Sequence, residues 1–165
     1  MKPLAIFGIN VLASFVSAVA AAVLFVSPWL QAQSTHVALL WLVVPHMFLR
    51  FIGLSFLVPG VVSASLPRSW AAPAAYGDLL AGIFAIIAAA ALAHSLSWAI
   101  SAVWIFNVWG TLDLLYGFYK GARVNLALAP GPGALGAGYY LVTAIVPPLL
   151  VSHALVFIIL LRNGA

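Results

Sequence analysis

The 165-residue sequence contains no cysteine, only two acidic residues and only six lysines and arginines. Without cysteine, disulfides, thiolate metal sites and cysteine nucleophiles are excluded. The six cations give a net charge of +4 but form no basic patch, so nucleic acid is excluded as a partner. The sequence also lacks a phosphate-binding loop, a zinc-protease histidine pair and a serine-hydrolase elbow. Whether the chain is an enzyme therefore stays open.

Apolar residues make up most of what is present. The chain is 66% hydrophobic and 5% charged, whereas a soluble domain carries about 25% charged residues. A soluble fold of this composition would expose an almost entirely apolar surface, so the lipid bilayer is the expected surrounding. We expect a multi-pass protein of the bacterial inner (cytoplasmic) membrane, with residues 1–165 forming a single transmembrane domain.

Five apolar stretches are long enough to cross a bilayer, which takes about 20 residues each. They lack the alternation of polar and apolar residues that is typical of membrane barrels, so the fold class is all-α. The first stretch exceeds the apolar region of a signal peptide, about 7–15 residues, and is interpreted as a retained span. The sequence thus predicts a bundle of five transmembrane helices over residues 4–27, 37–62, 75–94, 97–119 and 139–162.

The positive charges predict the orientation of this bundle. With the N-terminus in the cytoplasm, Lys2, Arg68, Lys120 and Arg123 lie inside and only Arg162 lies outside. This distribution follows the positive-inside rule. The N-terminus is therefore expected in the cytoplasm and the C-terminus outside.

Small residues recur every four positions in two of the predicted spans. One series runs along residues 75–94 (Gly77, Ala81, Ala85, Ala89, Ala93) and the other along residues 4–27 (Ala13, Ser17, Ala21). Small residues at this spacing let helices approach closely. Both series are expected to lie at helix contacts.

Polar residues inside the spans fall into two layers when depth is counted from the outer end of each span. His46, Asn107 and His153 come at about 14–15 Å, given a rise of 1.5 Å per residue. By the same count, Arg50 comes at about 20 Å, and Asp113 and Asn10 at about 24–25 Å. Charged residues within a span usually face protein or water, so Arg50 and Asp113 are expected to pair. The six residues form the predicted site.

The second acidic residue and three prolines also lie inside the predicted spans. Asp78 follows the start of the span at 75–94, where a carboxylate caps a helix, so we expect it to lie far from Asp113. Pro45, Pro147 and Pro148 remove backbone hydrogen bonds beside the polar residues and predict kinks there.

We interpret the chain as a protein that binds or transports a small ligand, ion or proton near the middle of the membrane. Arg50 would offer positive charge and hydrogen-bond donors, and Asp113 would be its counter-ion or a proton acceptor. His46 and His153 would exchange protons, since histidine titrates near neutral pH. No metal site is predicted, and the cofactor is unknown.

Three other interpretations remain open. In a b-type cytochrome, His46 and His153 would be axial ligands of haem b. An intramembrane enzyme would act on a lipid-soluble substrate through the histidines and Arg50. An accessory subunit would use all the polar groups as contacts between helices. Assembly as a homo-oligomer or within a larger membrane complex is compatible with each interpretation.

Overall fold

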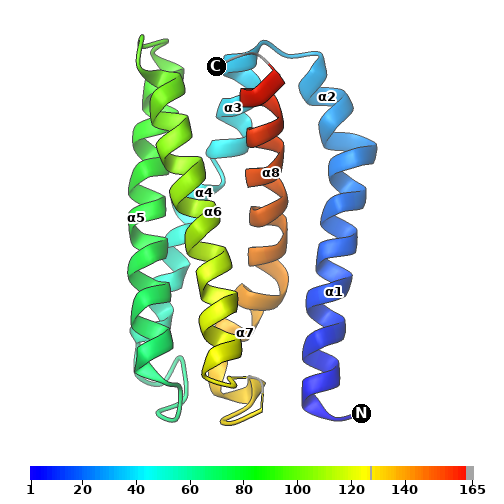
Figure 1. Cartoon of the computed structure of the whole chain (residues 1–165), viewed down its shortest axis with the longest axis vertical. Helices are drawn as coiled ribbons and strands as arrows, with labels where there is room; N and C mark the ends of the chain where they lie inside the picture. The colour runs from blue at the N-terminus through cyan, green and yellow to red at the C-terminus, as the bar shows by residue number, and fades with distance from the viewer. Residues whose placement is uncertain (127, 163–165) are drawn as a thin grey trace.

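The computed structural model describes residues 1–126 and 128–162, and all the regular elements in that part of the chain are helical. These elements join into five helical stretches that are long and apolar enough to cross a membrane, as many as the sequence predicts. They run alternately up and down, with the two termini at opposite ends (Figure 1). Their bounds are Pro3–Gln31, Thr35–Leu57, Arg68–Ala93, Ala99–Arg123 and Gly138–Arg162.

Four of the five helices form the body of the bundle, and the first lies against its side. The body consists of α3 (Thr35–Val43), α4 (His46–Leu49) and η2 (Arg50–Leu57) in one column, with α5 (Arg68–Ala93), α6 (Ala99–Arg123) and α8 (Val146–Arg162). α5 packs against the α3–α4–η2 column and against α6, and α8 packs against α6 and α3. The first helix, α1 (Pro3–Ala21), contacts chiefly α8 and the turn before it and buries none of its own residues.

Two helix boundaries differ from those expected by five residues or more. α5 begins at Arg68, seven residues before the predicted start of the third span. The second span ends at Leu57 rather than at residue 62, because Val58 leaves the helix in an extended conformation and Gly60 adopts a positive φ of 85°. The earlier start of α5 moves Asp78 away from the helix end and into the interior of the bundle.

Prolines interrupt the regular hydrogen bonding where the sequence predicts kinks. Pro45 separates α3 from α4, which continues as the 3₁₀ helix η2. Pro147 and Pro148 follow a π-helical turn, η4 (Leu141–Ile145), and this turn follows the short α7 (Gly138–Tyr140). A further π-helical turn, η1 (Ala22–Val26), precedes Pro28 in α2 (Ser27–Gln31). A proline lacks the N–H group that would continue the ladder, and such breaks are frequent causes of a changed helix register.

The two series of small residues behave differently. In α5, Gly77, Ala81, Ala85 and Ala89 are buried, which confirms the expected helix contact at four of the five positions, whereas Ala93 is exposed. In α1, Ala13, Ser17 and Ala21 are exposed, so the expectation of a contact through them within this chain is wrong. α1 meets the bundle instead through its larger residues, such as Phe7, Val11 and Phe15, which are half-buried.

The buried apolar residues form an upper cluster, a lower cluster and a small third cluster of Leu114, Val146 and Leu149. The upper cluster joins α3, α5, α6 and α8 and includes Leu39, Val43, Phe106 and Val156, all fully buried. The lower cluster centres on Phe56, Trp70 and Leu135 and is closed by the loop helix η3 (Pro132–Leu135). The polar residues lie between the upper and lower clusters.

Candidate functional site

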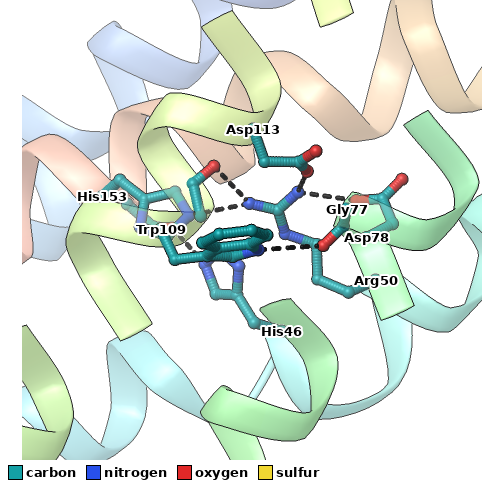
Figure 2. A network of polar contacts seen from close by, with 9 residues as sticks. His46, Arg50, Gly77, Asp78, Trp109, Asp113 and His153 are labelled. Carbon is teal, nitrogen blue, oxygen red and sulfur yellow. Dashed lines mark hydrogen bonds and ion pairs between the residues drawn. The ribbon is translucent and has the colours of Figure 1, made fainter. Parts of the chain in front are cut away.

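Arg50 lies at the centre of the bundle, and its side chain is fully buried. Its Nη1 donates hydrogen bonds to Asp78 Oδ1 at 2.6 Å and to Asp113 Oδ2 at 3.0 Å. Its Nη2 donates to the carbonyl oxygen of Gly110 at 2.7 Å and contacts His153 Nε2 at 3.0 Å (Figure 2). One side chain from η2 is thus bonded to α5, α6 and α8.

Two carboxylates therefore share a single guanidinium nitrogen. Neither pair is bidentate, although that geometry gives the strongest arginine–carboxylate bonds. Asp78 Oδ2 and Asp113 Oδ1 have no hydrogen-bond partner among the described residues. The side chains of Asp78 and Asp113 are 8% and 9% exposed. With all three groups ionised, this part of the site carries one surplus negative charge.

Histidine and asparagine side chains form the layer above Arg50. His153 Nδ1 and Asn107 Oδ1 lie 2.7 Å apart, and Asn107 Nδ2 donates to the His153 carbonyl oxygen at 3.2 Å. His46 Nε2 lies 2.7 Å from Ser152 Oγ, and its ring is 4.5 Å from that of His153. His46, Asn107 and His153 are all fully buried.

The bond with Arg50 determines which ring nitrogen of His153 carries the proton. An arginine can only donate, so His153 Nε2 must accept and Nδ1 must donate to Asn107. We expect Asn107→Leu to leave that N–H group unpaired and to lower the free energy of unfolding by about 1–3 kcal/mol. Thermal unfolding measures the loss, and ¹⁵N chemical shifts of His153 report the tautomer. A variant as stable as the wild type, or a wild-type ring protonated at Nε2, would contradict this assignment.

Three glycines make room for the network, one from each of three helices. A Cβ atom on Gly53 would overlap the Asp78 side chain, and one on Gly77 would overlap the Asp113 carboxylate. A Cβ atom on Gly110 would come within 2.6 Å of His153 Nε2 and 2.9 Å of Arg50 Nη2. The glycines at these positions let the helices and the charged groups approach closely.

A small cavity lies beside the two carboxylates on the lower side. It has a volume of about 50 Å³, and its walls include Asp78, Asp113, Phe56 and Leu141. It shares four wall residues with a larger hollow of about 340 Å³ that extends to the loop residues Asn125 and Leu128; the shared residues are Trp70, Gly117, Phe118 and Val142. Above the network, the upper apolar cluster is tightly buried. The carboxylates are therefore closer to open space below than above.

A second hollow reaches Asp113 from the outer surface between α5 and α6. We name this hollow the α5–α6 groove, and its volume is about 700 Å³. Its walls are mainly leucines and aromatic residues, with Asp113 and Gly77 at its base; the aromatic residues are Tyr76, Trp109, Tyr116 and Tyr119. The Trp109 indole donates to the Gly77 carbonyl oxygen at 3.2 Å and so links the two sides of the groove (Figure 2).

Five of the six residues predicted for the site come together, namely His46, Arg50, Asn107, Asp113 and His153. The sixth, Asn10, is exposed on α1 and donates instead to the Tyr139 hydroxyl at 2.7 Å. Asn10 is therefore not part of the network around Arg50, because α1 lies outside the four-helix body. Depth along a helix gives the layer of a residue but not the side to which it points.

Asp78 belongs to the site, contrary to its expected capping role. It lies in the third turn of α5, and its carboxylate makes the shortest ion pair with Arg50. The expectation that Asp78 lies far from Asp113 is therefore wrong. The sequence did contain the signal: counted from the outer end of its span, Asp78 lies at about 24 Å, the same depth as Asp113.

The two histidines do not fit the role of haem ligands. Axial ligands stand on opposite faces of the porphyrin with the iron between them. Here the two rings are in direct contact, and each Nε2 already has a partner in Ser152 or Arg50. Within residues 1–126 and 128–162, no group of three or more metal-binding side chains is suitably placed for a metal ion.

Comparison with known proteins gives one match. Residues 6–161 match the model of a domain of unknown function, DUF8737. No curated protein and no solved structure matches the chain. Because the match covers nearly the whole sequence, the chain belongs to the DUF8737 family.

Proposed function

We propose that the chain is an integral membrane protein that binds a proton or a small cation at Asp78 and Asp113, near the middle of the bilayer. Large apolar side chains exposed on the outside of the helices support insertion in a membrane; Leu12, Phe25, Phe48, Ile105 and Leu161 are examples. Lys2, Arg68, Lys120 and Arg123 gather at the lower end of the bundle and Arg162 at the upper end, which supports a cytoplasmic N-terminus and an external C-terminus.

The observation that carries the proposal is the ratio of two carboxylates to one guanidinium. An unbalanced charge in an apolar surrounding is costly, at least about 2.5–3.5 kcal/mol even on the most lenient insertion scale. A bound proton or cation removes this surplus. His153, packed above Arg50, supplies no compensating positive charge, because its Nε2 accepts a bond from Arg50. His46 Nδ1 is buried without a hydrogen-bond partner, so a second proton on that ring would also be unpaired.

The lower cavity offers a path for exchange. Its volume of about 50 Å³ is enough for water, which needs roughly 10–15 Å³ of accessible space. Water there would connect the carboxylates with the hollow that extends toward Asn125 and Leu128. In the proposed orientation this is the cytoplasmic side.

Infrared spectroscopy tests the proposal directly, because Asp78 and Asp113 are the only acidic side chains in the sequence. In lipid nanodiscs at neutral pH and low salt, we expect the C=O stretching band of one protonated carboxyl group. Raising the pH should remove the band, and the Asp78→Asn/Asp113→Asn double variant should lack it. Each single Asn variant should also lose it, since one ionised carboxylate then balances Arg50.

The competing explanation is a purely structural ion network. It predicts two ionised carboxylates whose bands do not respond to pH or to added sodium or potassium ions, and that result would overturn the proposal. Action on a lipid-soluble substrate at His46 gains no support, since His46 is fully buried and lines none of the hollows described above. Assembly with further copies or subunits, and residence in a bacterial inner membrane, stay predictions.

A further inference from the structure

The α5–α6 groove has the form of a ligand site that opens sideways. Its volume of about 700 Å³ falls within the usual range of small-molecule sites, roughly 300–1,000 Å³. Each of the two helices exposes residues that line the groove, such as Tyr76 on α5 at 55% and Leu112 on α6 at 60%. In a membrane, such a surface faces the lipid chains, so a ligand would reach it laterally from the bilayer.

The negative charge at the base of the groove favours a positively charged ligand. Asp113 is the only charged residue among the groove-lining residues in the described part of the chain. Its Oδ1 has no hydrogen-bond partner there, while its Oδ2 shares Arg50 Nη1 with Asp78. A cation in the groove would balance the surplus negative charge, whereas an anion would add to it.

The aromatic walls favour the same kind of ligand. Tyrosine and tryptophan faces attract cations by about 0.5–2 kcal/mol each, and aromatic surroundings are the usual recognition site for organic ammonium groups. Within the chain, Lys120 Nζ lies 6.0 Å from the centre of the Tyr116 ring, at the outer limit of such a contact. The leucines beside them offer an apolar surface to the rest of the molecule.

We infer that the α5–α6 groove binds an amphipathic organic cation, with the charged group at Asp113 and the apolar part among the aromatic and leucine side chains. This inference rests on the proposed function and specifies the chemical class of the cation. The cation replaces the proton at Asp113, and that proton leaves through the lower cavity.

Two ions of similar shape and opposite charge provide the probe. We expect radiolabelled tetraphenylphosphonium to bind the wild-type protein in nanodiscs saturably and stoichiometrically, above the level of empty nanodiscs. Tetraphenylborate should show no saturable binding. Asp113→Asn should weaken phosphonium binding at least about tenfold, equivalent to 1.4 kcal/mol. Tyr116→Ala should weaken it severalfold, whereas Phe48→Ala, an exposed aromatic residue on α4 outside the groove, should have no effect.

Two results would overturn the inference. One is equal uptake of both ions, which indicates partition into lipid only. The other is phosphonium binding that Asp113→Asn and Tyr116→Ala leave unchanged while both variants remain folded by thermal unfolding.

The infrared band separates this inference from the proposed function. Tetraphenylphosphonium should remove the protonated-carboxyl band of the wild type at constant pH, since the cation takes the place of the proton. A band that responds to pH but not to tetraphenylphosphonium would overturn the groove ligand and leave the proton site standing. Loss of both responses would overturn both proposals.

Discussion

Arg50→Met is expected to destabilise the bundle strongly, by about 3–5 kcal/mol, the usual cost of removing one partner from a buried ion pair. The variant leaves Asp78 and Asp113 facing each other in an apolar interior without their shared positive charge. It also removes the donors to the Gly110 carbonyl oxygen and to His153. Thermal unfolding in nanodiscs, followed by tryptophan fluorescence, measures the loss.

A triple variant separates charge from packing in this experiment. Arg50→Met combined with Asp78→Asn and Asp113→Asn removes all three charges and keeps side chains of similar size. We expect it to be more stable than Arg50→Met alone, since replacing a complete buried ion network is often close to neutral. A triple variant no more stable than the single one would show that the guanidinium acts mainly by filling space.

Gly110→Ala is expected to cost about 1–3 kcal/mol, as overpacking of a tight interior usually does. The added methyl group would lie 2.5 Å from His153 Cε1 and 2.9 Å from Arg50 Nη2, and neither group has free space to move into because both are fully buried. The bond between Arg50 and His153 should lengthen or break. Thermal unfolding and the ¹⁵N shifts of His153 measure the two effects.

Gly117 provides the matched control on the same helix. It lies two turns after Gly110, and a Cβ atom there would meet no heavy atom within 4 Å. Gly117→Ala should therefore leave stability unchanged or raise it by up to about 1 kcal/mol, the gain in helix propensity. Equal destabilisation by both substitutions would mean that close packing at Gly110 is not the cause.

The layer structure of the site could be predicted from the sequence because helix rise is constant. His46, Asn107 and His153 have similar distances from the outer ends of their spans, and the structure brings them into contact. The number of helices followed from the lengths of the apolar stretches in the same way. Both inferences use only the distance along a helix, which does not depend on how helices pack.

Two of the errors, at Asn10 and in the small-residue series of α1, concern what distance along a helix cannot give. Asn10 has the depth of Asp113, but α1 packs on the side of the bundle, and no local pattern in the sequence indicates which helix stays outside. The prediction that Ala13, Ser17 and Ala21 lie at a helix contact is wrong for the same reason. The prediction for Asp78 is wrong because the start of its helix was placed too late. α5 begins at Arg68, and its first two turns contain polar residues and Pro73. Because the predicted helix start was seven residues too late, Asp78 was interpreted as a helix cap rather than as an ion-pair partner of Arg50.

The sealed upper core has an electrical consequence. In a membrane, a proton or small cation that entered through the lower cavity would stop at Asp113, partway across the transmembrane field, because buried apolar residues such as Leu39, Phe106 and Val156 lie above the site. Crossing the whole field is worth about 2.3 kcal/mol per charge at 100 mV, so reaching a buried carboxylate draws on a fraction of that energy. With a negative cytoplasm and the proposed orientation, the proposed cation would move against the potential, and occupancy at Asp113 would fall as the membrane becomes more polarised.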